Sequence, residues 1–250
     1  MQTSRTPRSC GISAALLGLA TLALLGLAGA QAVQAQTAID TTPQSTGQSR
    51  IISWGVTDTS TYGQTFVAPS DNVLNNFTFY LGSQVGGSGP IQFQANVYAW
   101  DGTKAVGSAL FTSAPQSYTP VSSGYTPVFT STGITFLTVG QQYVAFLTTA
   151  GLQAGRPDSR VSWEATDGYQ DAYSGGQFVY INCGNDASQL TSSPWTTNIL
   201  GSGDLAFQMN FRPSAPVSPT PEPSTVTVMA LGVLGLAGLA FKARKRKLTM

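Results

Sequence analysis

Three acidic residues form the densest group of carboxylates in the chain. Glu164, Asp167 and Asp171 stand in the segment that begins at Trp163. Two carboxylates beside a saccharide can act as general acid and base, and loop oxygens can instead bind Ca²⁺. The spacing does not match an EF-hand loop, because Gly168 directly follows Asp167 and no Glu closes the loop. We therefore expect a solvated loop, with Ca²⁺ favoured over catalysis as its functional alternative.

Aromatic side chains are the second group that could bind a ligand, because sugars stack on exposed aromatic faces. The chain has four tryptophans and nine tyrosines. Burial is the ordinary place for such residues in a β protein. Trp100 and Tyr98 share the polar face of one predicted strand, so they are the best candidates for glycan stacking.

The chain lacks most of the residues that catalysis and metal binding commonly use. It contains no histidine, and its two cysteines are Cys10 and Cys183. Histidine is the commonest general base and transition-metal ligand. No Gly-x-Ser-x-Gly elbow or phosphate-binding glycine loop is present, and Cys183 has no basic neighbours to activate its thiol. We expect no catalytic residues, no cofactor and an inert, buried Cys183.

The charge distribution argues against nucleic-acid binding. The whole chain has 12 basic and 11 acidic residues, but seven of the basic ones lie near the two ends. The central part is therefore acidic and has no basic cluster. Neutralisation of phosphates supplies most of the affinity for nucleic acids, so this class of partner is excluded.

The central part alternates between apolar and polar residues as half-buried strands do. Phe77, Phe79 and Leu81 face one way, and the alternation is equally clear from Phe93 to Ala99 and from Leu205 to Phe211. The predicted strands are 50–54, 63–68, 74–81, 91–100, 107–112, 127–130, 134–138, 142–148, 160–165, 177–182 and 204–212.

Short strands separated by turn residues, without helical periodicity, indicate an all-β fold. Asp101-Gly102 is a hairpin signal, and Gly86-Gly87 and Gly175-Gly176 are further breaks. We predict one antiparallel β-sandwich, jelly-roll-like, over residues 50–212.

The N-terminal residues read as a secretion signal. Arg5 and Arg8 precede an apolar run from Ile12 to Ala28, and small residues follow it. We assign 1–35 to a signal peptide with a signal helix. The polar segment 36–49, rich in Thr, Gln and Ser, is predicted to be a flexible leader.

The C-terminal residues read as a membrane anchor behind a proline-rich stalk at 213–220. An uncharged run at 225–241 is long enough, as a helix, for a short transmembrane segment. The basic residues behind it predict that the end is cytoplasmic and the domain is outside. These stop residues are Lys242, Arg244, Lys245, Arg246 and Lys247.

The motif Pro221-Glu222-Pro223, the apolar run and the basic end resemble the PEP-CTERM sorting signal over 221–247. The resemblance implies recognition by exosortase, a membrane protease and transpeptidase of Gram-negative-type bacteria. A permanently anchored single-pass protein is the alternative. The segments 93–103, 143–147 and 175–179 also resemble a passenger domain of PEP-CTERM proteins, which implies a β-sandwich and no particular activity.

These observations predict an exported, non-enzymatic surface or matrix protein. Its expected partners are exosortase, inner-membrane lipid before processing and an exopolysaccharide that it binds weakly. It would begin as a single-pass inner-membrane precursor and end at the cell surface or in the extracellular matrix. The alternative is a secreted carbohydrate-active enzyme on a jelly-roll scaffold, using Glu164 with Asp167 or Asp171.

Overall fold

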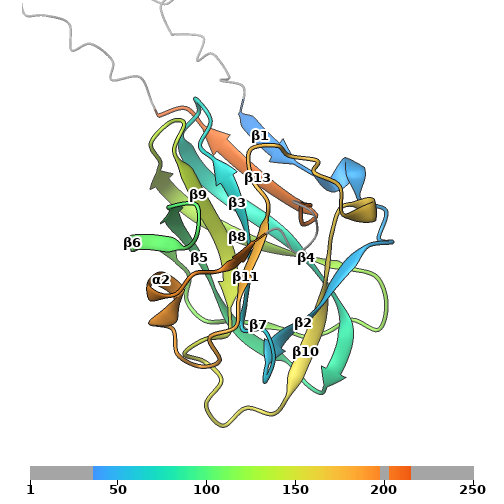
Figure 1. The fold of residues 1–250 in the computed structure, drawn as a ribbon. Helices are drawn as coiled ribbons and strands as arrows, with labels where there is room; N and C mark the ends of the chain where they lie inside the picture. Colours follow the sequence, from blue (N-terminus) through green and yellow to red (C-terminus); the bar gives the residue numbers. More distant parts are fainter. Residues whose placement is uncertain (1–35, 198–202, 215–250) are drawn as a thin grey trace, which may run out of the picture. The chain divides into compact units, whose positions relative to one another are not determined.

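The computed structural model describes residues 36–197 and 203–214, and this part of the chain is an antiparallel two-sheet β-sandwich (Figure 1). The predicted all-β sandwich is thus confirmed. The predicted signal helix and transmembrane helix lie outside the described residues. Within the described ranges, none of the helices has the length and apolar character needed to cross a membrane.

The first sheet is built around the long strand β4. Its order is β1-β13-β4-β10-β2. Strand β8 also pairs with β4, along the edge of β4 that lies opposite β13. The start of β1 lies beside the end of β13, since Thr37 pairs with Phe211. The strands of this sheet are β1 (Thr37–Asp40), β2 (Arg50–Val56), β4 (Val73–Gly87), β8 (Thr126–Phe136), β10 (Ser159–Glu164) and β13 (Phe207–Arg212).

The second sheet faces the first and has the order β12-β11-β3-β9-β5-β6, with β7 also pairing with β5. Its strands are β3 (Thr61–Val67), β5 (Ile91–Trp100), β6 (Ala105–Thr112), β7 (Gln116–Tyr118), β9 (Gln142–Thr148), β11 (Phe178–Ile181) and β12 (Thr196–Thr197). Short helices complete the described part: η2 (Thr42–Gln44), η3 (Asp167–Tyr169) and α2 (Gln189–Ser192).

The core between the sheets follows the predicted alternation. Phe77, Phe79 and Leu81 are fully buried, and the alternating apolar residues of β13 and of β5 from Ile91 to Val97 are buried too, whereas Ala99 is half-buried. Trp54 and Trp163 meet edge to face at its centre, with ring centroids 5.1 Å apart. Full burial of each large apolar side chain contributes on the order of 1.5–3 kcal/mol, so this core is the main source of stability.

The N-terminal segment is part of the sandwich, and the predicted flexible leader at 36–49 is wrong. Strand β1 extends the first sheet along β13. The buried Thr41 donates its hydroxyl to the carbonyl of Leu205 (2.8 Å) and accepts from the amide of Phe207 (2.9 Å). A Thr- and Gln-rich composition resembles a linker, but backbone pairing at a sheet edge requires no apolar side chain.

Candidate functional site

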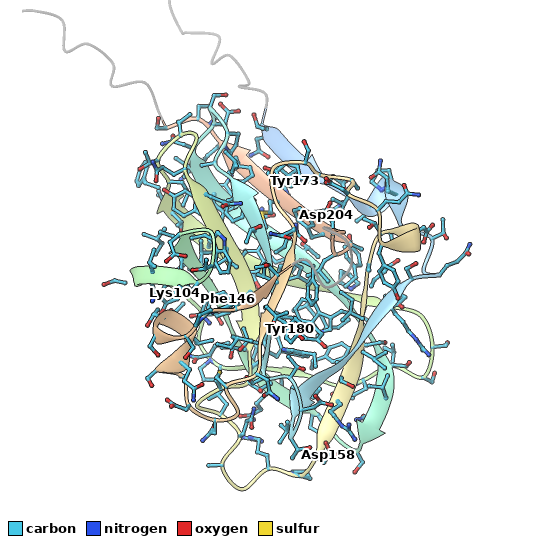
Figure 2. The ribbon with its side chains drawn as sticks, in the orientation of Figure 1. Lys104, Phe146, Asp158, Tyr173, Tyr180 and Asp204 are labelled. Carbon is cyan, nitrogen blue, oxygen red and sulfur yellow. The ribbon has the colours of Figure 1, made fainter. Side chains whose placement is uncertain are left out.

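A hollow between the edge strand β2 and the inner face of β3 and β11 is the candidate functional site. It has a volume of about 270 Å³, just below the usual range of about 300–1,000 Å³ for ligand sites. In Figure 2 the labelled Tyr180 lies near the middle of the domain, above Asp158 and below Asp204. The lining residues are Arg50, Ile51, Ile52, Thr59, Tyr62, Phe178 and Tyr180.

The hollow exists because the two sheets end at different places on this side. The first sheet stops at β2, whereas the second continues past β3 to β11 and β12. The side chains of Phe178 and Tyr180 lie on the face of β11 that packs on the core. Tyr180 remains half-buried, so part of its side chain is open to solvent.

Aromatic contacts make the floor of the hollow rigid. The ring of Tyr62 meets that of Phe178 edge to face, with centroids 5.2 Å apart, and Phe178 stacks on Tyr180 at 6.0 Å. The Tyr62 hydroxyl donates to the carbonyl of Ile52 (2.5 Å), which ties the floor to β2. Burial raises the pKa of Tyr62, so this hydroxyl keeps its proton and remains a donor.

One lining residue is a cation, and two residues outside the lining have strained backbone, one next to Ile52 in the chain and one hydrogen-bonded to Arg50. Arg50 is exposed, and its carbonyl accepts a hydrogen bond from the hydroxyl of Tyr169 (3.0 Å). Ser53 and Tyr169 have φ angles of 79° and 57°, which non-glycine residues seldom adopt. Strain of this kind concentrates at ligand-binding sites.

The composition of the hollow suits binding rather than proton transfer. The described residues that line it include no carboxylate. They offer one guanidinium, the phenol group of Tyr180 and aromatic faces, while the Tyr62 hydroxyl is already bonded to Ile52. Such a surface can stack on an apolar ring face and donate hydrogen bonds to hydroxyl or acidic groups.

Glu164 and Asp167, two of the three predicted acidic residues, accept hydrogen bonds from the N-terminal segment 36–49. Glu164 accepts a hydrogen bond from the Ser45 hydroxyl (2.7 Å), and Asp167 accepts from the amide (3.1 Å) and hydroxyl (2.7 Å) of Thr46. The hydroxyl bond from Thr46 is the main reason that the pKa of Asp167 is lowered.

Asp171 lies apart from this pair, so the predicted Ca²⁺ site is not assembled. It is exposed and lines a second hollow of about 480 Å³, together with residues 174–177. Among residues 36–197 and 203–214, no group of three or more His, Cys, Asp or Glu side chains is placed to bind a metal. The grouping of Glu164, Asp167 and Asp171 into one ligand set is therefore wrong.

One residue of the predicted glycan-stacking pair, Trp100, is covered by the polypeptide. Trp100 is only 7% exposed and meets Trp195 edge to face at 5.6 Å. Tyr98 is half-buried and stacks on Phe146 at 5.7 Å. The segment around α2 packs on this face of the second sheet and buries Cys183 and Trp195 there. The expected exposure of Trp100 is thus wrong, whereas the expected burial of Cys183 is confirmed.

Sequence reasoning missed a buried carboxyl group, Asp204. Its oxygens accept from the Gln64 side chain (2.6 Å) and the Tyr173 amide (2.7 Å). Burial raises the pKa of Asp204 to about 6, although these hydrogen bonds oppose the shift. Asp204 was the first residue of the predicted strand 204–212, of which residues 207–212 form β13. Alternation does not reveal how deeply a polar residue at such a position is buried.

The residues that line the hollow were also missed, because they come from separate strands. Arg50 and Phe178 lay in predicted strands, and the alternation of Phe178 and Tyr180 was the available signal. Pairing between β3 and β11 then brings Tyr62 and Tyr180 together.

The sorting signal lies outside the described residues, including Pro221, Glu222, Pro223 and the basic stop residues. Residues 219–247 match the family model described as the PEP-CTERM protein-sorting motif. This match confirms the resemblance predicted from the residues, and the motif implies an exported, membrane-anchored precursor.

No curated protein matches the chain. One similar solved structure contains the cysteine protease and lectin-like domains of Cwp84, a surface layer associated protein of Clostridium difficile. The identity is 15% and the TM-score is 0.41, over 72% of this chain and 36% of that one. The chain thus spans about a third of the length of that structure.

Proposed function

We propose that this protein is an exported surface or matrix protein that exosortase processes at its PEP-CTERM motif. The observation that carries the proposal is the match of residues 219–247 to the sorting-motif model. The precursor would be held in the inner membrane by 225–241, with the β-sandwich outside the cytoplasm. Cleavage near Pro221–Pro223 would then release the domain or attach it in the envelope.

Mass spectrometry of cell-surface and culture fractions tests the processing step. In a strain with exosortase, the C-terminal peptide should end near Pro221–Pro223, and in a strain without it the tail should be intact. Replacing Glu222 with Ala is expected to leave the tail intact in both strains. The same full-length tail in both strains with the natural motif would contradict the proposal.

We propose further that the sandwich binds a saccharide weakly in the hollow between β2 and β11. The half-buried ring of Tyr180 would stack on a sugar, and Arg50 would pair with acidic groups of an exopolysaccharide. The volume of about 270 Å³ suits one or two sugar units of a longer chain.

The binding proposal predicts a loss of affinity when the Tyr180 ring is removed. Truncation of an aromatic anchor costs about 2 kcal/mol or more, which is roughly thirtyfold in Kd. Calorimetric titration with exopolysaccharide fragments should show this loss for Tyr180→Ala. Phe129→Ala, which removes an exposed ring from β8, is the matched control and should bind as the unaltered protein does. Equal binding by both variants would contradict the assignment of the hollow.

We propose a non-enzymatic role without a cofactor. Glu164 and Asp167 already accept hydrogen bonds from residues 45 and 46, which supports a structural role for both. We also propose that the scaffold is a jelly roll, because β2-β10-β4-β8 and β3-β9-β5-β6 form its two sheets and the chain repeatedly crosses between them.

A further inference from the structure

Strand β8 is an open edge of the first sheet. It pairs with β4 over residues 126–136, and no other strand of the described chain pairs with it. An edge strand presents alternate N–H and C=O groups to whatever lies beside it. The ladder is regular from Thr126 to Ser131, and a bulge follows before Thr135.

The edge lacks the charges that usually protect such strands. From Ala105 to Gly155 the sequence contains no Lys, Arg, Asp or Glu. This uncharged stretch includes β6, the neighbouring edge of the second sheet, which contacts β8. Natural sheets commonly place charged residues, above all Lys, on their edges to prevent pairing between chains. Between Thr126 and Ser131, Pro127 is the one residue that has no backbone N–H group to donate.

A row of apolar side chains accompanies the open edge. Phe129, Ile134 and Phe136 are 59%, 62% and 63% exposed, and Val139 beyond the strand is 56% exposed. Around Phe129 the sheet face is polar, since Thr78 on β4 is its direct neighbour in the ladder. The apolar row therefore lies on the outermost strand of this face, where the side chains of a neighbouring strand would pack beside it.

We propose that two copies of this chain associate through β8, in antiparallel register, to join their first sheets. An uncharged strand suits its own copy, because a twofold axis brings identical residues together and identical charges would repel. Directly opposite residues in an antiparallel ladder share a face. We place the axis at Phe129 or Thr130, within the regular part of the ladder, so Phe129 faces either its own counterpart or Ser131 of the second copy.

Introducing a charge at Phe129 tests this contact on the full-length chain in a mild detergent. Light scattering after size exclusion should give a dimer for the natural protein. Phe129→Lys and Phe129→Glu should each be monomeric, with association weakened at least about tenfold, because like charges would lie close together. An equimolar mixture of the two variants should form the dimer again.

Two further variants complete the test. Ser131→Lys, at the next outward position of β8, should also be monomeric. Ile52→Lys places the same charge on the exposed edge of β2 and should leave the dimer intact. A single cooperative thermal transition in each variant would show that it folds. A monomeric natural protein, a dimeric Phe129→Lys variant or a mixture that stays monomeric would each overturn the proposal.

Discussion

The sandwich has two open sides, and they differ in how their exposed apolar groups arise. On the side of β2 and β11, the second sheet extends beyond the first, so inner-face aromatics such as Tyr180 reach solvent. On the side of β6 and β8, Phe129 and Phe136 lie exposed along the edge of the first sheet. The first side forms a hollow with Arg50 at its rim, whereas the second is an uncharged edge.

This difference separates two kinds of recognition. A concave site with fixed aromatic rings suits a small group that enters it. A strand edge with free backbone groups suits another strand, and its specificity depends on which side chains lie opposite. We therefore propose ligand binding at the first side and self-association at the second, and four predictions test this separation.

The largest expected difference between the sides is in stability. Trp163 is fully buried and supports the floor of the hollow, with its ring 5.6 Å from that of Tyr62. Trp163→Ala should lower the free energy of unfolding by about 3–5 kcal/mol. Phe129→Ala on the β8 side should change it by no more than about 0.5 kcal/mol when the protein concentration is low enough to keep the chain monomeric. Urea unfolding measures both, and equal losses would remove the distinction between core and edge.

The second prediction is that the stability of the fold depends on pH through Asp204, which is bonded to Gln64 on β3, the strand next to β11. With the pKa of Asp204 raised to about 6, the folded chain holds a proton that the unfolded chain releases near pH 4. This carboxyl should therefore destabilise the fold as pH rises from about 4 to 6, by roughly 3 kcal/mol.

Asp204→Asn isolates this effect, because it removes the titration while Asp167 and other carboxyls remain. Urea unfolding of the natural protein, relative to the variant, should show stability decreasing from pH 4 to 7. A difference that is independent of pH would show that Asp204 titrates like an exposed carboxyl.

A smaller effect is expected from the hydroxyl that ties the floor of the hollow to β2. Tyr62→Phe removes the donor to the Ile52 carbonyl and should cost about 1 kcal/mol in unfolding free energy. Tyr180→Phe, on the open side of the same aromatic group, is the matched control and should cost less. Thermal unfolding compares them, and an equal cost would mean that the tie to β2 adds no stability.

The smallest expected effect is the different salt dependence of saccharide binding on the first side and of self-association on the second. Raising salt from about 0.1 M to 1 M shortens the Debye length from about 10 Å to 3 Å. Binding of an acidic saccharide near Arg50 should weaken, whereas association through the uncharged β8 should change by less than about twofold. Calorimetry and light scattering provide the two readings, and salt-sensitive association would contradict an uncharged contact.

Alternation predicted the buried faces of the strands well. Phe77, Phe79 and Leu81 lie in the core as expected, because a period of two reports directly which face is apolar. It could not show what covers the other face. Trp100 stands on the outer side of its sheet, yet the segment around α2 buries it.

Sequence proximity was a poor guide to the acidic residues. Glu164 and Asp167 contact a segment more than a hundred positions earlier, and Asp171 lines a different hollow. Asp204 and Gln64 show the converse case, in which residues far apart in the chain share a buried hydrogen bond. Side-chain type indicated possible chemistry, but only strand pairing selected the neighbours.

The sequence by itself determined the sorting signal and the class of the fold. Both are local properties, because the sorting motif is contiguous at 219–247 and alternation needs only neighbouring residues. The tertiary structure decided which strands became edges, which aromatic rings remained open and which carboxyl group was buried. These outcomes depend on pairing between strands distant in the chain, such as β2 with β10 and β11 with β3.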